Sequence, residues 1–346
     1  MEPLQAARAF RLAGAVRRIR PYGAGLIHHT FLVEAEGGRR AVLQRLNTAV
    51  FPDPDAVMAN LRGVLDHLAD RADEARPLVF PRLIPTREGG DWLDDAGGPW
   101  RMLSFVDGRG LARCPGPAEA RQAGFALGRF HRLLAELDPG GLRPALRGFH
   151  DTPAYLAALE ARVAGARLEA GAREAWAFIR ARRGWVAEFA AARPRLHHAL
   201  VHGDPKFDNL LFTGAGRALS LVDLDTVQRA PRLLDVADAL RSCCNPAGED
   251  PPAPEAVRFE PSWCRAWLEA YLEEADLGEA DRRWFYPALR LLPLELGMRF
   301  LADHLAGDRY FKTTRPGQNL HRAQVQLALV RAIEAGEETL RDAAAG

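Results

Sequence analysis

Lysine is almost absent from this 346-residue chain, although basic residues are abundant. Lys206 and Lys312 are the only lysines among 46 basic residues, so arginine supplies nearly all of the positive charge. Frequent arginine and alanine can reflect codon usage alone. A lysine that persists inside a polar loop, as Lys206 does, is therefore a candidate for chemistry.

Cysteines, net charge and long apolar runs are also scarce, and their scarcity excludes several classes of protein. The four cysteines lack the spacing of a zinc site, so we expect reduced thiols and a cytoplasmic protein. A net charge of +1 creates no field that would attract nucleic acid or an anionic membrane. No run has the length of a membrane span, and the first residues lack the apolar core of a signal peptide.

The most informative stretch is a short polar loop with apolar runs on both sides. Asp204 and Asn209 stand in the order His-x-Asp-x-x-x-x-Asn, which is the spacing of kinase catalytic loops. Strand-like runs at 210–212 and 218–222, joined by a glycine-containing turn, predict a hairpin that returns the chain to the loop. The hairpin would bring Asp223 beside Asn209.

These residue types fit the chemistry of phosphoryl transfer. A carboxylate such as Asp204 can accept the proton of an attacking hydroxyl, while Asn209 and Asp223 can hold the magnesium ion that bridges the phosphates. Lys206 could reach the transferring phosphate and offset its negative charge. An isolated Asp-x-x-x-x-Asn is common in loops, because both residues favour turns. The interpretation therefore depends on the whole set.

Two other polar residues near the loop are predicted to have structural roles. We expect His202 to brace the loop through hydrogen bonds rather than to take part in the chemistry. Asp235 stands at the start of a predicted helix, where it could cap exposed N–H groups or brace the loop.

The first hundred residues predict a small sheet. Strand-like segments at 16–21, 30–35 and 40–46 surround a turn with Gly23 and Gly25, which is the order of a nucleotide-covering loop in a kinase small lobe. Glycines there let backbone N–H groups approach phosphates. The same Gly-x-Gly pattern also occurs in ordinary hairpins.

Further elements complete the predicted N-terminal lobe. The segment 54–71 has helical spacing, and 80–85 and 100–106 are strand-like. The last of these contains Phe105 and leads into a polar turn. It fits either a hinge that pairs with an adenine edge or an ordinary strand of the sheet.

From about residue 117 the sequence is helical. The predicted helices are 118–137, 152–163, 172–189, 233–241, 262–276, 279–291, 294–305 and 320–340. In the helix 294–305, Glu295, Arg299 and Asp303 recur every four residues and share one face. They form either an exposed row of ion pairs or a polar wall for a substrate rich in hydroxyls. Gly307 is expected to end this helix, and Asn319 to cap the last one.

The order of these elements predicts an α+β, protein-kinase-like fold with two lobes. Residues 1–106 would form a β-rich N-lobe with one helix, and residues 107–346 a helical C-lobe that holds the catalytic loop and the substrate site.

Several strings resemble one known family, in its order and over nearly the full length. They include Pro21-Tyr-Gly-Ala-Gly25, Leu43-Gln-Arg-Leu-Asn47, Asp204-Pro-Lys-Phe-Asp-Asn209, Val222-Asp-Leu-Asp-Thr226 and Tyr310-Phe-Lys312. The chain is similar to the aminoglycoside-phosphotransferase and choline-kinase-like family, and within it most similar to the N-acetylhexosamine 1-kinases.

This resemblance implies ATP- and Mg²⁺-dependent phosphorylation of a small-molecule sugar, at the anomeric hydroxyl of an N-acetylhexosamine or related hexose. We expect a monomer or dimer. It implies these roles: Asp204 as base assisted by Lys206; Asn209, Asp223 and Asp225 at the metal; Gly23, Gly25, Gln44 and Phe105 at the nucleotide; His28, Arg299, Asp303 and Tyr310 at the sugar.

The chain departs from general kinases in one respect. No lysine precedes residue 206, and Gln44 occupies the expected place of the strand-three lysine. The hexosamine kinases look alike here. Two alternatives remain: a kinase of another small alcohol such as choline or an aminoglycoside, and a non-catalytic nucleotide-binding module. A choline site would show an aromatic cage, and an aminoglycoside site an acidic wall; the mixed charges at 295–303 favour neither.

Overall fold

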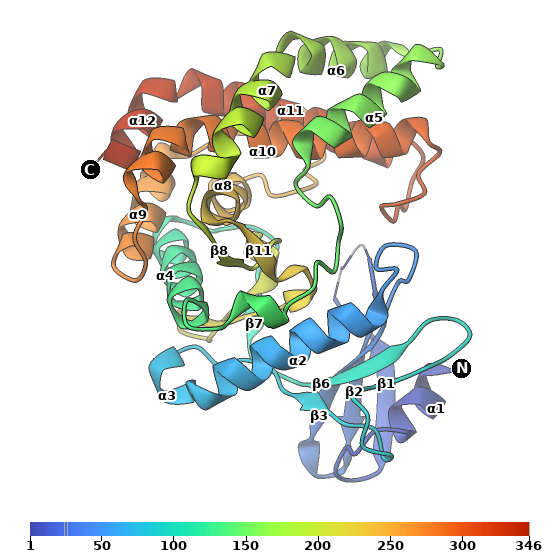
Figure 1. Ribbon diagram of the computed structural model, residues 1–346. Helices are drawn as coiled ribbons and strands as arrows, with labels where there is room; N and C mark the ends of the chain where they lie inside the picture. Colours follow the sequence, from blue (N-terminus) through green and yellow to red (C-terminus); the bar gives the residue numbers. More distant parts are fainter. Residues whose placement is uncertain (24, 26, 346) are drawn as a thin grey trace.

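The computed structural model describes residues 1–23, 25 and 27–345, so residue 24 of the predicted glycine turn lies outside the described residues. The chain forms a β-rich N-terminal part and a larger helical part (Figure 1), which confirms the predicted α+β, kinase-like fold. The division at residues 106 and 107 remains a prediction.

The N-terminal sheet is antiparallel and has the order β1-β2-β3-β6-β4, with β5 also paired to β6. Its strands are β1 (Val16–Pro21), β2 (His29–Ala35), β3 (Arg40–Arg45), β4 (Leu83–Ile84), β5 (Trp92–Leu93) and β6 (Trp100–Ser104). The strand expected at 80–85 shrinks to two residues, because Pro81 and Pro85 on either side have no N–H to donate to a ladder.

Helices border this sheet. They are α1 (Pro3–Arg8), α2 (Pro54–Asp70) and α3 (Ala72–Ala75). The Asp53 side chain accepts a hydrogen bond from the amide of Ala56, which fixes the start of α2. Val57, Leu61 and Val64 of α2 are buried at helical spacing, as the sequence pattern predicts.

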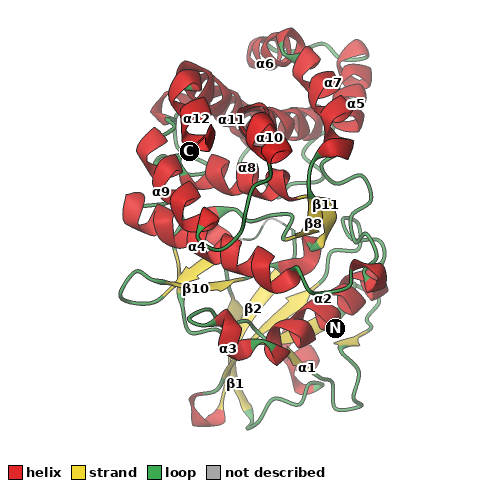
Figure 2. Cartoon of the chain, turned by 60° about the vertical axis from the view of Figure 1, so that its left-hand side comes forward, coloured by secondary structure: helices red, strands yellow, loops and turns green. Residues whose placement is uncertain are grey.

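Most helices of the C-terminal part pack around α10, while α4 and α9 pack against each other (Figures 1 and 2). The helices are α4 (Pro117–Leu134), α5 (Thr152–Ala164), α6 (Ala170–Ala181), α7 (Arg183–Ala192), α8 (Arg232–Cys243), α9 (Pro261–Leu272), α10 (Glu279–Leu305), α11 (Gln318–Ala335) and α12 (Glu337–Ala345).

Three predicted helix boundaries are wrong. The segments 279–291 and 294–305 form one helix, since packing of α10 against α11, α8 and α5 carries it through Pro287 and Pro293. The segments 172–189 and 320–340 are each broken, at Arg182 and Gly336.

Two small antiparallel sheets place the predicted catalytic loop. The strands β8 (His198–Val201) and β11 (Gln228–Pro231) pair with each other, while β9 (Leu210–Phe212) pairs with both β10 (Ala218–Leu221) and β7 (Arg109–Gly110). The loop lies between β8 and β9, and the β9–β10 hairpin returns the chain to it. The predicted hairpin is therefore confirmed.

Within the described residues, no helix is both long and apolar enough to cross a membrane.

Candidate active site

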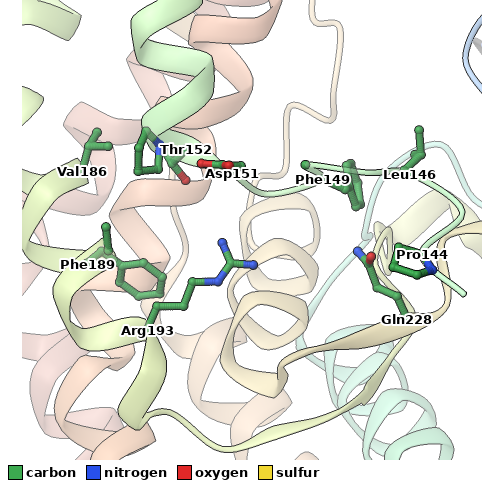
Figure 3. A pocket seen from close by; sticks show the side chains of 12 residues that line it. Pro144, Leu146, Phe149, Asp151, Thr152, Val186, Phe189, Arg193 and Gln228 are labelled. Carbon is green, nitrogen blue, oxygen red and sulfur yellow. The ribbon is translucent and has the colours of Figure 1, made fainter. Parts of the chain in front are cut away.

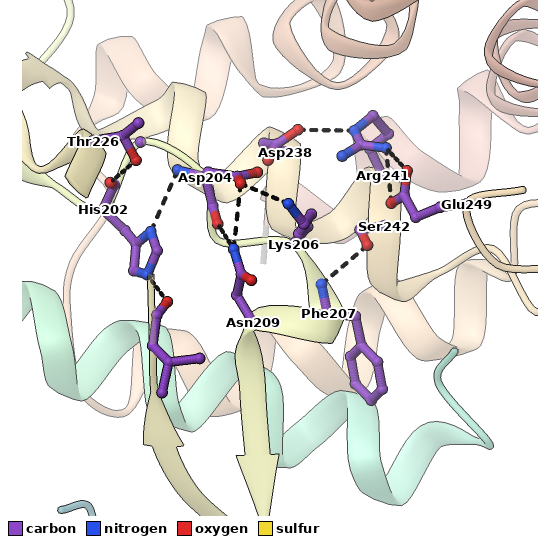
Figure 4. Close-up of polar contacts among 12 residues, drawn as sticks. His202, Asp204, Lys206, Phe207, Asn209, Thr226, Asp238, Arg241, Ser242 and Glu249 are labelled. Atoms are coloured by element: carbon purple, nitrogen blue, oxygen red, sulfur yellow. Dashed lines mark hydrogen bonds and ion pairs between the residues drawn. The ribbon is translucent and has the colours of Figure 1, made fainter. Parts of the chain in front are cut away.

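Asp204, Lys206 and Asn209 form a connected group in the loop after β8 (Figure 4). The Lys206 Nζ lies 2.7 Å from Oδ2 of Asp204. The Asn209 amide nitrogen donates to the backbone oxygen of Asp204 at 2.9 Å and to its carboxylate at 3.3 Å. The three side chains are thus held against one another in one short loop.

The hairpin brings Asp223 to this group, as the sequence predicts. The amide of Val222 donates to the carbonyl oxygen of Asn209 at 2.9 Å, so the next residue, Asp223, lies beside the loop. Asp223 adopts a left-handed conformation with φ 66° and ψ 56°, which is rare for residues other than glycine. Such strain is typical of functional sites.

The donor atoms fit a hard divalent cation. Because the Asn209 nitrogen is engaged with Asp204, its amide oxygen is left for another ligand, and the Asp223 carboxylate is exposed. Carboxylate and amide oxygens are the ligands that magnesium prefers, and Mg²⁺ keeps several of its own waters. Asn209 and Asp223 would therefore suffice to hold it.

Two buried residues brace the loop from behind. The Asp235 carboxylate accepts hydrogen bonds from the backbone amides of His202 and Gly203, at 2.6 and 2.8 Å, and from the His131 ring at 3.0 Å. The His202 ring bonds the carbonyl oxygen of Val222 at 3.0 Å. The predicted bracing role of His202 is confirmed, and Asp235 braces the loop instead of capping α8.

The charge of Lys206 keeps Asp204 ionised. Burial alone would raise the pKa of the Asp204 carboxyl, but the neighbouring Lys206 ammonium outweighs burial and lowers that pKa to about 2. Asp204 is therefore a carboxylate throughout the neutral range, ready to orient a hydroxyl and accept its proton.

Lys206→Met should shift the acid limb of the pH profile. Without the ammonium, burial dominates and the pKa of Asp204 rises, so protonation removes the base at higher pH than in the wild type. We expect the acid limb of kcat/KM to move upward by at least about one pH unit. An unchanged limb in this variant would show that Lys206 does not control the protonation of Asp204.

Asp225 lies at a junction between the two parts of the chain. Arg101 of β6 donates to both carboxylate oxygens, with Nη2 2.7 Å from Oδ2, and the ring of His28 lies 2.8 Å from the same oxygen. The His28 Nδ1 accepts the amide of Asn47 at 3.1 Å, so its Nε2 carries the proton that is donated to Asp225.

The contacts at this junction bear on the predicted roles of His28 and Asp225. The ring nitrogens of His28 are both engaged, and its Nε2–H cannot ligate a metal although it lies near Asp223 and Asp225. Asp225 has both oxygens in hydrogen bonds with Arg101 and His28. The sugar contact of His28 and the metal contact of Asp225 remain predictions.

The predicted nucleotide residues lie on the N-terminal sheet and its turns. Gly23 has φ +77°, which glycine adopts without strain, and Gly23 and Gly25 are exposed. Phe105, just after β6, makes an edge contact with Tyr22 of the glycine turn, with ring centroids 5.9 Å apart. The Gln44 side chain on β3 is hydrogen-bonded to Arg101. Its Oε1 accepts hydrogen bonds from Nε and Nη2 of Arg101, at 2.9 and 2.7 Å.

Arg299 of α10 stands inside a ring of aromatic side chains. Its guanidinium carbon lies 5.2 to 5.8 Å from the centroids of four rings, those of Phe149, Tyr155, Tyr310 and Phe311. No carboxylate of the described residues comes within ion-pair distance of this guanidinium.

The surroundings of Arg299 connect it with the catalytic loop. Burial would lower its pKa, but the negative charge of Glu295 and Asp204 and the phenols of Tyr155 and Tyr310 raise it. Arg299 therefore stays charged within electrostatic reach of Asp204. Together with Tyr310, which is half-buried, it provides a cationic and aromatic cluster that interacts electrostatically with Asp204, the predicted base.

Glu295 and Asp303, on the same helix, support neighbouring segments of the site through hydrogen bonds. Glu295 is buried and bonds His150 at 2.8 Å, while His150 reaches the carbonyl oxygen of Gly203 at 3.2 Å. The exposed ion-pair row considered from the sequence is therefore wrong.

Asp303 organises the loop that follows α10. Its carboxylate accepts the backbone amides of Arg309, Tyr310 and Phe311 and the side-chain amide of Asn319, at 2.8 to 2.9 Å. One of these contacts is to the amide of Tyr310 and two are to the amides on either side of it, so the contacts of Asp303 indicate support of the segment 309–311. Asn319 does not cap α11, which starts after Gly317.

A separate hollow of about 400 Å³ opens between α5, α7 and the loop before α5 (Figure 3). Phe149, Asp151, Arg193 and Gln228 are among its lining residues, and Arg193 bonds the carbonyl oxygen of His150 at 2.6 Å. None of the predicted site residues lines it. Phe149 is also one of the four rings around Arg299, so the hollow adjoins that cluster, while the residues of the loop at 204–209 lie outside its lining.

Arg101 is a residue that sequence reasoning missed. Arg101 interrupts the apolar strand β6 and is only 1% exposed, so a charged residue within an apolar strand was the available signal. His131 is predicted from the sequence to be a hydrogen-bonded helix residue and not a ligand, and this is confirmed; its partners Asp235 and Tyr271 could not be predicted, because they lie more than a hundred residues away.

Known proteins resemble this chain in sequence and in fold. Residues 18–253 match the family model described as "Phosphotransferase enzyme family". An aminoglycoside phosphotransferase from Alicyclobacillus acidocaldarius has a similar structure, with a TM-score of 0.66 at 17% identity over 99% of this chain and 97% of that one.

Two further solved structures are similar. A microcompartment-associated aminopropanol kinase gives a TM-score of 0.63 at 17% identity, covering 97% of this chain and 96% of that one. A choline/ethanolamine kinase family protein from Mesorhizobium loti gives 0.61 at 20% identity, covering 99% and 97%. At such identities the likeness shows the fold alone.

The family match covers the N-terminal sheet, the catalytic loop and Asp223. The chain therefore belongs to the phosphotransferase enzyme family and is, as its loop motif predicts, a kinase-type phosphotransferase for small molecules.

Proposed function

We propose that this enzyme transfers the γ-phosphoryl group of ATP to a hydroxyl of a neutral sugar, the anomeric hydroxyl of an N-acetylhexosamine or related hexose. The observation that carries the choice of acceptor is Arg299, a charged guanidinium within a ring of aromatic side chains and in electrostatic reach of Asp204.

The aromatic ring supports a neutral acceptor because its cation is already present. An aromatic cage that binds choline does so by surrounding an ammonium group. Here Arg299 of the protein occupies that place, so a cationic acceptor would meet a like charge at the same position. A hydroxyl or acetamido oxygen, in contrast, can accept hydrogen bonds from the guanidinium, and aromatic faces suit sugar rings.

The loop supports the chemistry. Asp204 would orient the acceptor hydroxyl and take its proton, and Lys206 would offset negative charge on the transferring phosphoryl group. Asn209 and Asp223 are the residues that would hold magnesium, which would offset the negative charge of the phosphates. A spectinomycin phosphotransferase of similar fold, described in complex with ADP, favours an adenine nucleotide as donor.

A panel of acceptors tests the proposal. The protein would be incubated with Mg–ATP and N-acetylhexosamines, neutral hexoses, the free-amine hexosamines, choline and an aminoglycoside, and the products identified by mass and NMR. The matched pair of acetylated and free-amine hexosamine isolates the effect of charge. We expect a sugar 1-phosphate from the neutral acceptors. Turnover on choline or an aminoglycoside, with none on any neutral sugar, would contradict the choice of acceptor and leave the enzyme class intact.

Arg299→Met should raise the KM for the acceptor. Loss of a charge-assisted hydrogen bond costs about 1.5–3 kcal/mol, or roughly 10- to 100-fold in affinity. Methionine preserves much of the contact with the four rings. Arg309→Met is the matched control, because Arg309 is exposed in the neighbouring loop. Equal KM values for both variants and the wild type would remove Arg299 from the acceptor site.

A further inference from the structure

The N-terminal sheet lacks the strand-three lysine of general kinases but contains a different buried cation. Gln44 occupies the expected position on β3, and Arg101 lies directly opposite it on β6 in the strand register. Side chains opposite each other across a ladder share one face of a sheet. Arg101 therefore projects on the same face as Gln44.

Four of the five N–H groups of the Arg101 guanidinium are committed to two partners. Its Nε and Nη2 donate to Gln44, and its Nη1 and Nη2 form a two-bond contact with the Asp225 carboxylate. The side chains of Arg101 and Asp225 are each 2% exposed. Truncating one partner of such a pair leaves an uncompensated buried charge, so the pair fixes the position of its loop strongly.

Asp225 belongs to the segment that carries Asp223, the predicted metal ligand. Asp223 is held in a left-handed backbone conformation, which costs of the order of 1–3 kcal/mol and persists only where the surroundings enforce it. Arg101 and His28 bind Asp225 from the sheet side, and Lys312 of the helical part donates to the carbonyl oxygen of His28 at 2.6 Å. These contacts tie the sheet to the segment.

We propose that Arg101 is a positioning residue for phosphoryl transfer. Arg101 lies on β6, is oriented by its hydrogen bonds to Gln44, and holds the Asp223–Asp225 segment in the geometry that binds the metal–nucleotide complex. It supplies the sheet with a buried cation where β3 has no lysine. Arg101 acts through Asp225 and contacts neither phosphate nor acceptor. The inference rests on the proposed function only for its kinetic consequence.

The principal test is Arg101→Gln, with ATP binding measured by calorimetry in the presence and absence of magnesium. Positioning partners of metal ligands typically contribute roughly 10- to 100-fold to metal affinity or activity. We expect a loss of that size in magnesium-dependent ATP binding and in kcat. Metal-free ATP binding and the KM for the acceptor should stay within about threefold, because Arg101 touches neither ligand.

Three more variants separate positioning from general stability. Arg18→Gln removes an exposed arginine of the same sheet and is the control. Arg101→Lys keeps the buried charge but loses the planar two-bond contact, so it should fold and still require about tenfold more magnesium. The double variant Gln44→Lys/Arg101→Gln moves the cation to β3, and it should recover at least about tenfold of the loss.

A folded Arg101→Gln protein with wild-type dependence on magnesium overturns the inference. If Arg101→Gln does not fold, as judged by its melting curve, wild-type dependence of ATP binding on magnesium in Arg101→Lys overturns the inference. Failure of the double variant to recover any binding also counts against it. Magnesium-dependent ATP binding is measured without an acceptor, so a wild type that binds Mg–ATP but phosphorylates no alcohol contradicts the proposed function alone.

Discussion

Replacing Asp204 with asparagine should lower kcat by on the order of 10²-fold or more, as the loss of a general base does. Binding of ATP should remain within about threefold of the wild type, because asparagine keeps the size and nearly the shape of the aspartate side chain. The ion pair with Lys206 is lost, but both groups are part-exposed, so the fold should tolerate the change. Steady-state kinetics and calorimetry of the same preparation would measure both quantities.

The control for this variant lies in the same loop. Asp208→Asn makes the same chemical change four residues later, at an exposed side chain whose charge also acts on Lys206. It should stay within about threefold of the wild type. Equal kcat values for the two variants would remove Asp204 from the role of base. If wild type and Asp204→Asn both bind ATP and neither transfers a phosphoryl group, the chain is a nucleotide-binding module.

Asp235→Ala should lower the free energy of unfolding more than any other variant described. The carboxylate accepts two backbone amides of the catalytic loop and the His131 ring, and it is 1% exposed. Its removal leaves three buried donors without an acceptor, at about 1–3 kcal/mol for each unsatisfied group. We expect the free energy of unfolding to fall by at least about 3 kcal/mol, with kcat also reduced because the loop loses its support.

A second substitution at Asp235 distinguishes this support from an ordinary core contact. His131 is neutral in the folded protein, since burial outweighs Asp235 and lowers its pKa, and its Nδ1 accepts the Tyr271 hydroxyl at 2.9 Å. Asp235→Asn retains one acceptor oxygen and should therefore lose less stability than Asp235→Ala. Urea unfolding of both variants measures the difference. A loss below about 0.5 kcal/mol in the alanine variant, the range of surface substitutions, would contradict the bracing role.

The part of the site that sequence predicts is the part whose residues are close in the chain. Asp204, Lys206 and Asn209 lie within six consecutive positions, and a short hairpin returns Asp223 to them. Spacing and turn chemistry are sufficient there. The Arg101–Asp225 pair joins residues 124 apart, and no local pattern marks such a contact.

The helix boundaries show the same division. The C-terminal end of α10 could be predicted, because Gly307 has φ +83° just after the last turn. Its continuation through Pro293 could not, since packing against neighbouring helices decides it. Asp303 was expected to contact substrate from its helical spacing, but which groups it bonds depends on the path of the following loop.

The most direct test of the central claim follows a labelled γ-phosphoryl group from ATP. Wild-type protein and Asp204→Asn, matched in ATP binding, would be mixed with magnesium and an N-acetylhexosamine, and the label located after a single turnover. The proposed site predicts that the wild type carries the label to the sugar while the variant leaves it on ATP. Label that stays on ATP in both proteins, or that moves equally fast in both, would contradict it.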